Sequence, residues 1–231
     1  MKIRLKFRKQ GNLRFIGHLD VMRTFQKINR RAGIDIRYSA GFSPHQQMSF
    51  ATPLGLGLTS DAEYVDYDML SVPGKEAFLR QMNEHNVEEL KILDACLLPD
   101  DAKNAMSLLA ASDYLLTFRE GCEPEDYDDF FEDFRRFLDQ EHIPAVKKTK
   151  TGTQEVDLIR QIRKFERRGN AVFLRLDTGS RSNCKPEFVM ETFYRSLGKE
   201  WSSFTFHINR EELYGEENGE LKALIDYGTE F

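Results

Sequence analysis

Apolar and basic residues alternate at the start of the chain. Ile3, Leu5 and Phe7 are apolar, and the residues around and between them are basic: Lys2, Arg4, Lys6 and Arg8. A period of two places apolar side chains on one face of a β-strand and charged side chains on the other. The pattern therefore predicts a half-buried strand with a basic outer face.

The next segment has the period of an amphipathic helix. From His18 to Ala32, apolar residues recur every three or four positions, and Gly33 follows as a C-terminal stop. Four basic residues fall on the opposite face: Arg23, Lys27, Arg30 and Arg31. We therefore predict a helix whose solvent face is basic.

The remaining periodicity predicts two similar passes of strands and helices. In the first half, we expect strands near 34–38, 63–69 and 90–97 and a helix around 78–82. In the second half, we expect a strand at 114–118, a helix opened by Pro124, strands at 145–149 and 171–177, a helix at 186–197 and a strand at 204–208. Residues 154–168 fit a strand and hairpin or a short helix, and we favour the strand.

Two consecutive βαββαβ passes are typical of α+β proteins built from ferredoxin-like units, each an antiparallel sheet with helices on one face. We place a basic N-terminal unit at residues 1–98 and a second unit at 112–210, with residues 98–112 as the linker between them. The final residues, 211–231, resemble an acidic tail with a possible short helix.

The net charge of −5 conceals a strong asymmetry. The first fifty residues carry eleven Lys and Arg against two Asp, a local charge of +9, so the remainder carries −14. Segregation of this size indicates either a polyanionic partner such as RNA or docking of the basic part on the chain's own acidic part.

Several function classes lack their sequence signals. The three cysteines, Cys96, Cys122 and Cys184, are isolated, so neither a disulfide framework nor a cysteine-ligated metal site is expected. The sequence contains no GxSxG elbow, no phosphate-binding GK[ST] motif and no apolar run of about 18 to 20 residues. We expect a cytoplasmic protein without cofactor or metal, more readily a binding protein than an enzyme.

A long turn-rich segment follows the basic helix and contains GFSPHQQMSF. A hydroxyl, a rigid turn and an imidazole lie together at Ser43, Pro44 and His45, as a phosphate or ribose contact would require. His18 begins the basic helix, where exposed amides favour anions. If the loop folds back on the helix, His18, Asp20, Ser43 and His45 would converge.

The candidate nucleic-acid contacts are Lys2, Arg4, Lys6, Arg8, Arg23, Lys27, Arg30, Arg31, Phe42, Ser43 and His45, with a second-half surface at Lys147, Lys148 and Lys150. Phe15, Tyr38 and Phe50 are further stacking candidates. A structural interpretation remains open for each: solvated or self-paired charges, turn hydrogen bonds and a helix cap. Asp66 and Asp68 share one strand face and could bind a cation, although such pairs are more often simply exposed.

Four stretches carry a resemblance to a known family: RFIGHLDVMRTFQKINRRAG, GFSPHQQMSFATPLGLGLTSDAEYVD, KTKTGTQEVDL and NCKPEFVMETF. Together they resemble the radical SAM-linked (radical SAM-associated) proteins, a domain of unknown function, to about residue 210. Gln46 departs from the proline common at that position in the family. The resemblance implies a radical SAM protein as partner, because this chain lacks the CxxxCxxC triad that would hold such a cluster.

Three functions compete. The one we favour is an accessory RNA-binding or substrate-presenting module that works with a radical SAM enzyme. The second is a metal-independent endoribonuclease similar to the double-ferredoxin CRISPR RNA-processing proteins, with His18 or His45 as weak general acid/base candidates. The third is a protein-binding adaptor that uses the acidic segment 123–141.

Overall fold

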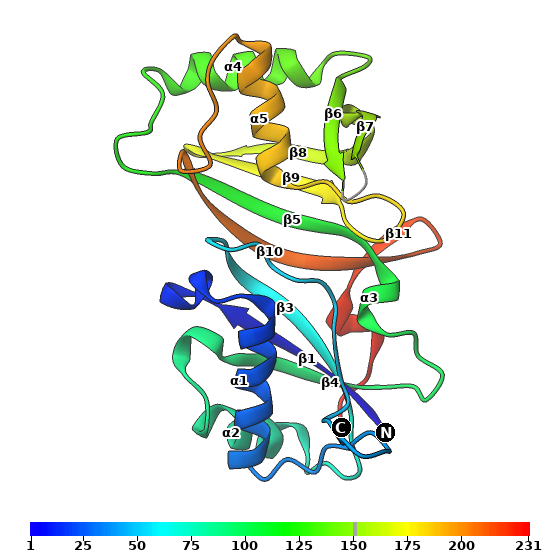
Figure 1. The fold of residues 1–231 in the computed structure, drawn as a ribbon. Helices are drawn as coiled ribbons and strands as arrows, with labels where there is room; N and C mark the ends of the chain where they lie inside the picture. The colour runs from blue at the N-terminus through cyan, green and yellow to red at the C-terminus, as the bar shows by residue number, and fades with distance from the viewer. Residues whose placement is uncertain (150–151) are drawn as a thin grey trace. The chain divides into compact units, whose positions relative to one another are not determined.

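The computed structural model describes residues 1–149 and 152–231 and has a mixed α+β architecture with largely antiparallel sheets (Figure 1). The predicted α+β class is therefore confirmed. The chain divides into two compact units, residues 1–110 with 210–231, and residues 111–209.

The first unit contains both chain termini. Its elements are β1 (Lys2–Lys9), the 3₁₀ helix η1 (Gly11–Phe15), α1 (His18–Arg31), β2 (Met48–Phe50), β3 (Thr59–Asp68), α2 (Lys75–Glu84), the 3₁₀ helix η2 (Glu88–Leu90), β4 (Ile92–Leu98), α3 (Ala105–Leu108), the larger part of β10 (Phe206–Glu217), β11 (Glu220–Ala223) and the 3₁₀ helix η4 (Leu224–Tyr227). The strand order is β4-β1-β3-β10, with β2 paired to β3 and β11 to β10.

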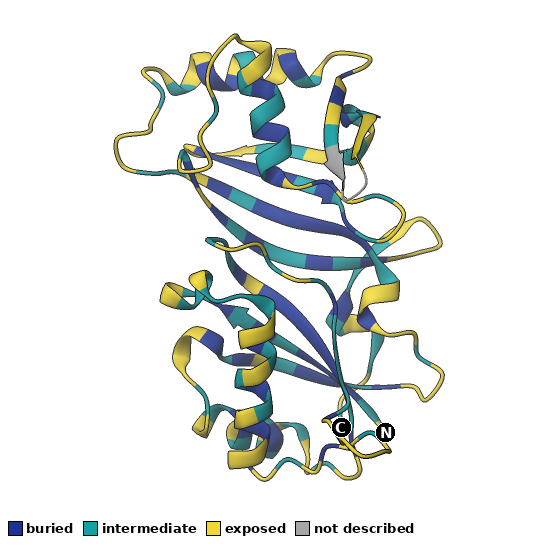
Figure 2. Ribbon diagram, viewed as in Figure 1, coloured by how far each residue is buried: buried dark blue, intermediate teal, exposed yellow. Residues whose placement is uncertain are grey.

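One face of this sheet forms the main core. The apolar side chains of β1, including Leu5 and Phe7, pack against α1 and α2 through buried residues such as Phe25 and Phe78. Figure 2 shows the contrast between the buried strands and the exposed outer side of α1. The alternation in the first nine residues correctly predicted this core face.

The opposite face of the sheet is covered. A second cluster joins Ala62 and Tyr64 of β3 to Ala105 of α3 and Leu224 of η4. The basic face of β1 was predicted to lie open, and that prediction is wrong because α3 and η4 close over it.

Arg4 lies at the centre of the covered face and is fully buried. Its guanidinium donates to both carboxylate oxygens of Asp66, from Nε at 2.7 Å and from Nη2 at 2.9 Å. It also donates to the backbone oxygens of Leu224 and Lys103, and Asp66 accepts from the Ala105 amide at 2.7 Å. One ion pair therefore connects the sheet to both covering segments.

The C-terminal residues are an integral part of the first unit. Residues 211–231 form the end of β10, then β11 and η4, and Thr229 pairs with Leu97 through two backbone hydrogen bonds. Gly228 lies against β4 so closely that an added Cβ would be 2.6 Å from both the Cys96 sulfur and the Leu97 oxygen. The expectation of a separate acidic tail is thereby corrected.

The second unit contains the remaining elements. They are β5 (Leu109–Phe118), α4 (Tyr127–Leu138), β6 (Pro144–Thr149), β7 (Gly152–Asp157), the 3₁₀ helix η3 (Leu158–Gln161), β8 (Ile162–Arg168), β9 (Ala171–Asp177), α5 (Pro186–Ser196) and the first residues of β10. β9 pairs with both β5 and β8, whereas β6 and β7 form a separate two-stranded sheet. Phe130 and Phe134 of α4 pack edge-on against Phe193 of α5 and join the helices.

Some predicted elements shift. Residues 34–38 contain only isolated bridges at Ile36 and Tyr38, and the short strand of that region is β2. The strand predicted at 145–149 lies in the separate hairpin, and β8 pairs with β9 instead, so 154–168 is mainly extended, as we favoured. Helix α4 begins at Tyr127 rather than near Pro124, because the Asp126 side chain caps it by accepting from the amides of two following residues.

We expect Asp66→Ala to destabilise the protein by about 3–5 kcal/mol, because it leaves the buried Arg4 guanidinium without its counter-charge. Urea unfolding followed by circular dichroism measures the change. Arg136→Ala, which removes an exposed cation paired to Glu132, is the control and should have little effect. A loss for Asp66→Ala no larger than the control would mean that the pair does not hold the covered face.

Candidate nucleic-acid interface

The other basic residues of β1 also have partners within the first unit. Lys6 Nζ lies 2.5 Å from a Glu212 carboxylate oxygen, and Arg8 pairs with Glu88. Lys2 Nζ donates to the backbone oxygens of Asp100 at 3.1 Å and Ala102 at 3.3 Å. The strand half of the predicted RNA surface is therefore neutralised or internally bonded, which removes it as an open polyanion site.

The basic residues of α1 have a different environment. Lys27, Arg30 and Arg31 are exposed, and none of them has an ion pair within the described residues. Arg23 has only an exposed pair with Asp20 at 3.3 Å. At about 100° per residue, Arg23, Lys27 and Arg30 lie within about 60° of one another. The helix half of the predicted surface is therefore a continuous positive face, available to solvent.

The loop at residues 38–46 lies beside this helix. Phe42 at its tip is fully exposed, at 110% of the reference area. Ser43 and His45 are exposed as well, and the His45 Nδ1 lies 2.8 Å from the Ser39 hydroxyl. The loop thus presents an aromatic ring and polar groups of the kinds that bind RNA bases and phosphates.

A buried polar network fixes the loop to α1. Asn29 of the helix donates to the Gln46 side-chain oxygen at 2.9 Å and accepts from the Tyr67 hydroxyl at 3.0 Å. The Gln46 amide donates to the Tyr38 hydroxyl at 3.1 Å and to the Gln26 backbone oxygen at 3.3 Å. Burial raises the pKa of Tyr67 well above its ordinary value, so its hydroxyl stays protonated and able to donate. Sequence reasoning missed this network, although a polar Asn on the apolar face of a helix was a usable signal.

The two histidines do not converge. The His18 ring packs edge-on against Phe50 with centroids 5.1 Å apart, whereas His45 contacts Ser39. Gln46, next to His45, contacts α1 at Gln26, eight residues beyond His18 and therefore about 12 Å along the helix axis. The predicted meeting of His18, Asp20, Ser43 and His45 is not formed.

The cysteine thiols and the Asp66 and Asp68 carboxylates show no sign of a catalytic or metal-binding role in this structure. Burial raises the pKa of the Cys96 thiol to about 11 and that of the Cys184 thiol to about 12, so both are protonated at neutral pH. Asp66 is bound to Arg4, and Asp68 lies 3.1 Å from Arg37. In residues 1–149 and 152–231, no group of three His, Cys, Asp or Glu side chains is arranged to hold a metal ion. No helix in the same residues is long and apolar enough to cross a membrane.

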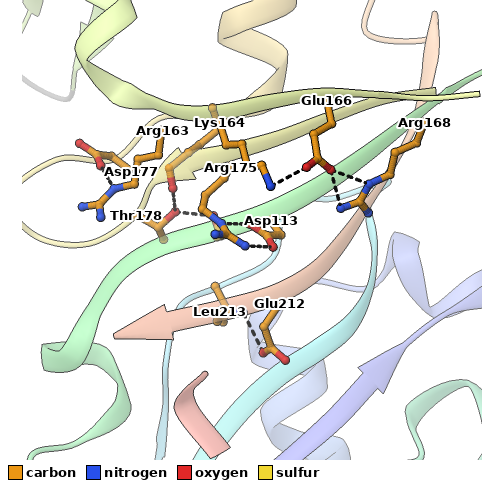
Figure 3. Close-up of polar contacts among 12 residues, drawn as sticks. Asp113, Arg163, Lys164, Glu166, Arg168, Arg175, Asp177, Thr178, Glu212 and Leu213 are labelled. Atoms are coloured by element: carbon orange, nitrogen blue, oxygen red, sulfur yellow. Dashed lines mark hydrogen bonds and ion pairs between the residues drawn. The ribbon is translucent and has the colours of Figure 1, made fainter. Parts of the chain in front are cut away.

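The basic residues of the second unit are mostly paired. Figure 3 shows Arg163 with Asp177, Arg175 with Asp113, and Glu166 between Lys164 and Arg168. Of the predicted second-half surface, Lys147 donates to the backbone oxygen of Asn183. Lys150 lies outside the described residues, as does the side chain of Lys148. Exposed cations of this unit such as Arg135 and Lys199 have no ion pair in the described residues, but they lie on different elements.

A pocket of about 430 Å³ opens in the first unit beside the same loop. Its wall is formed by the end of the loop, the edge of the sheet and the segment after β4; the lining includes Lys2, His45, Ser49, Asp68, Leu98 and Asn104. Two residues predicted as RNA contacts, Lys2 and His45, thus lie in one pocket.

The fold and the site define an α+β protein with an exposed basic helix face, a fixed aromatic loop and an adjoining pocket. The chain belongs to a family described as an uncharacterized protein conserved in bacteria (DUF2344), whose model matches residues 2–186. The match confirms a family of unknown function, and the association with radical SAM enzymes stays a proposal.

No curated protein matches the chain. A solved structure titled "Crystal Structure of a Cbf5-Nop10-Gar1 Complex" is similar with a TM-score of 0.45 and 11% sequence identity. The similarity covers 93% of this chain and 50% of that one, so this chain spans about half the length of the matched protein. At that level the likeness supports no inference about function.

We expect Gln46→Leu to destabilise the protein by about 1–3 kcal/mol, because the buried Asn29 amide loses its acceptor. Thermal or urea unfolding measures the loss, and hydrogen exchange of residues 38–46 should rise. Gln47→Leu is a matched control, since the Gln47 side chain has no partner in the described part of the chain. Equal stability of the two variants would show that the network does not fix the loop.

Proposed function

We propose that this protein is an RNA-binding accessory module and not itself an enzyme. Its RNA contact is the outer face of α1 together with the loop at residues 38–46. The observation that supports this proposal is the set of exposed, unpaired cations at Lys27, Arg30 and Arg31 on a helix to which the loop is bonded through Gln46. The same loop carries the exposed Phe42 ring.

The electrostatics limit the size of the contact. Phosphate contacts by Lys and Arg supply most of the affinity for RNA, and each contributes to its salt dependence. The cations of β1 add little, because carboxylates and carbonyl oxygens of the first unit already bind them. Three or four phosphates along α1, with a base stacked on Phe42, are what this surface can hold.

The architecture in this proposal is a pair of ferredoxin-like units. The first follows the order β1, α1, β2, β3, α2, β4, and the second the order β5, α4, β8, β9, α5 and the first residues of β10, with the β6–β7 hairpin inserted. Sheets packed against helices in this way commonly serve as rigid supports for binding loops.

The partner in this proposal is a radical SAM enzyme, to which the bound RNA would be presented. It rests on the family resemblance of the GFSPH segment and its neighbours. The endoribonuclease alternative has less support, because His18 and His45 contact different residues and do not form an acid/base pair. Binding of the enzyme partner without RNA would favour the adaptor alternative.

We expect the combined variant Arg23→Glu, Lys27→Glu, Arg30→Glu to lose most of its affinity for single-stranded RNA. Fluorescence anisotropy between roughly 50 and 200 mM salt measures binding. Loss of three phosphate contacts should make the slope of log K against log salt shallower by about 2, at roughly 0.7 per contact.

The matched control reverses three exposed cations on other elements: Arg80→Glu, Arg135→Glu and Lys199→Glu. It changes the net charge equally and should leave the affinity and the slope close to wild type. The proposal fails if the wild type binds no RNA at low salt, or if the two variants behave alike.

A further inference from the structure

The wall of the pocket beside the loop is formed by residues from several elements of the first unit. His45 and Gln47 come from the end of the loop, Ser49 from β2, Asp68 from β3 and Leu98 from β4. Its volume of about 430 Å³ lies within the roughly 300–1,000 Å³ typical of small-molecule sites. The RNA contact proposed above includes His45 and Gln46 of this wall but assigns no ligand to the pocket itself.

The charged groups of the pocket are already satisfied. The Asp66 carboxylate binds the Arg4 guanidinium and the Ala105 amide, and Asp68 lies 3.1 Å from Arg37. Lys2 donates to two backbone oxygens. A charged ligand would have to compete with these internal partners, so the pocket favours a neutral molecule.

The hydrogen-bonding groups of the pocket that are available to a ligand are neutral. The Ser49 hydroxyl and the Gln47 side-chain amide have no hydrogen-bond partner in the described part of the chain. His45 is bonded through Nδ1, so its other ring nitrogen is the one that remains for a ligand. Met48 and Leu98 add apolar surface to the same wall. Uncharged donors and acceptors next to apolar surface suit the edge and face of a nucleobase.

The pocket and the basic helix are joined by shared residues. Gln46 lines the pocket and also bonds to Gln26 and Asn29 of α1. Tyr67 likewise lines the pocket and bonds to Asn29. The loop and the Asn29 network are thus shared between the pocket wall and the helix that carries the cations.

We propose that this pocket receives one unstacked base of the RNA strand held by α1, a proposal that rests on the function proposed above. The ligand class is therefore single-stranded RNA or an RNA loop, in which a base can leave the stack at low cost. Ser49, Gln47 and His45 contact the base edge, and Met48 and Leu98 contact its face.

An abasic scan tests the pocket directly. A short fluorescein-labelled RNA is prepared with the base removed at one position at a time, and each oligonucleotide is titrated with the full-length protein. With wild type, we expect one position at which loss of the base weakens binding about tenfold, the effect of a few hydrogen bonds and apolar contacts. Ser49→Trp, which fills the pocket, should weaken binding of intact RNA similarly and abolish the effect at that position.

The double variant Ser49→Ala, Gln47→Leu removes the hydrogen-bonding groups without filling the space, so it tests the same base if Ser49→Trp fails to fold. Equal effects of every abasic position on wild type, or an unchanged positional effect in both variants, would overturn the pocket proposal. RNA binding that depends on the α1 cations would then stand unaffected.

Binding of free nucleosides tests the pocket independently of RNA binding by α1. Uridine, cytidine, adenosine and guanosine are titrated into the protein and observed by NMR. Saturable shifts of pocket residues that disappear in Ser49→Trp would support the pocket even if the wild type failed to bind RNA. Absence of such shifts, together with a flat abasic scan, would exclude a base site.

Discussion

A buried guanidinium needs a partner, and the ion pair of Arg4 with Asp66 meets this need at the centre of the first unit. Because the pair also bonds to Leu224, Lys103 and Ala105, the sheet cannot present this face to solvent. The chain's opening strand, for all its positive charge, is an internal element. The charge asymmetry of the sequence therefore arises in part from internal ion pairs. Acidic residues later in the chain, such as Asp66 and Glu212, neutralise basic residues of the opening strand.

The residues that remain exposed to solvent on α1 and its loop determine the proposed function. Helix α1 buries Phe25 and Ile28 and leaves Lys27 and Arg30 to solvent, so its orientation separates structural from available residues. The neutral network around Asn29 holds the loop against the same helix without using any charge. The exposed cations of α1, the exposed ring of Phe42 and the neutral pocket thus belong to one unit, although each depends on different residues.

The sequence predicted most elements because periodicity reports which face is buried, as at Leu5 and Phe7. Prediction failed where contacts between segments distant in the sequence determine which residues are buried. Arg4 stands opposite Asp66 in the antiparallel ladder, and the two alternating patterns, KIRLK and YVDYD, contained that signal. Glu212, Leu224 and the covering role of residues 211–231 could not be predicted, because no local pattern tells a tail from a strand that returns to the first unit. Gln46 was noted only as a departure from proline, whereas it fixes the candidate site.

The most direct measurement is hydrogen exchange of the protein with and without single-stranded RNA, read by mass spectrometry at peptide level. We expect new protection in α1 and in residues 38–50, and none in β1 or in residues 218–231, whose groups are already bonded internally. Protection confined to the second unit, or no change anywhere under conditions in which RNA is bound, would contradict the assignment of RNA binding to α1 and its loop.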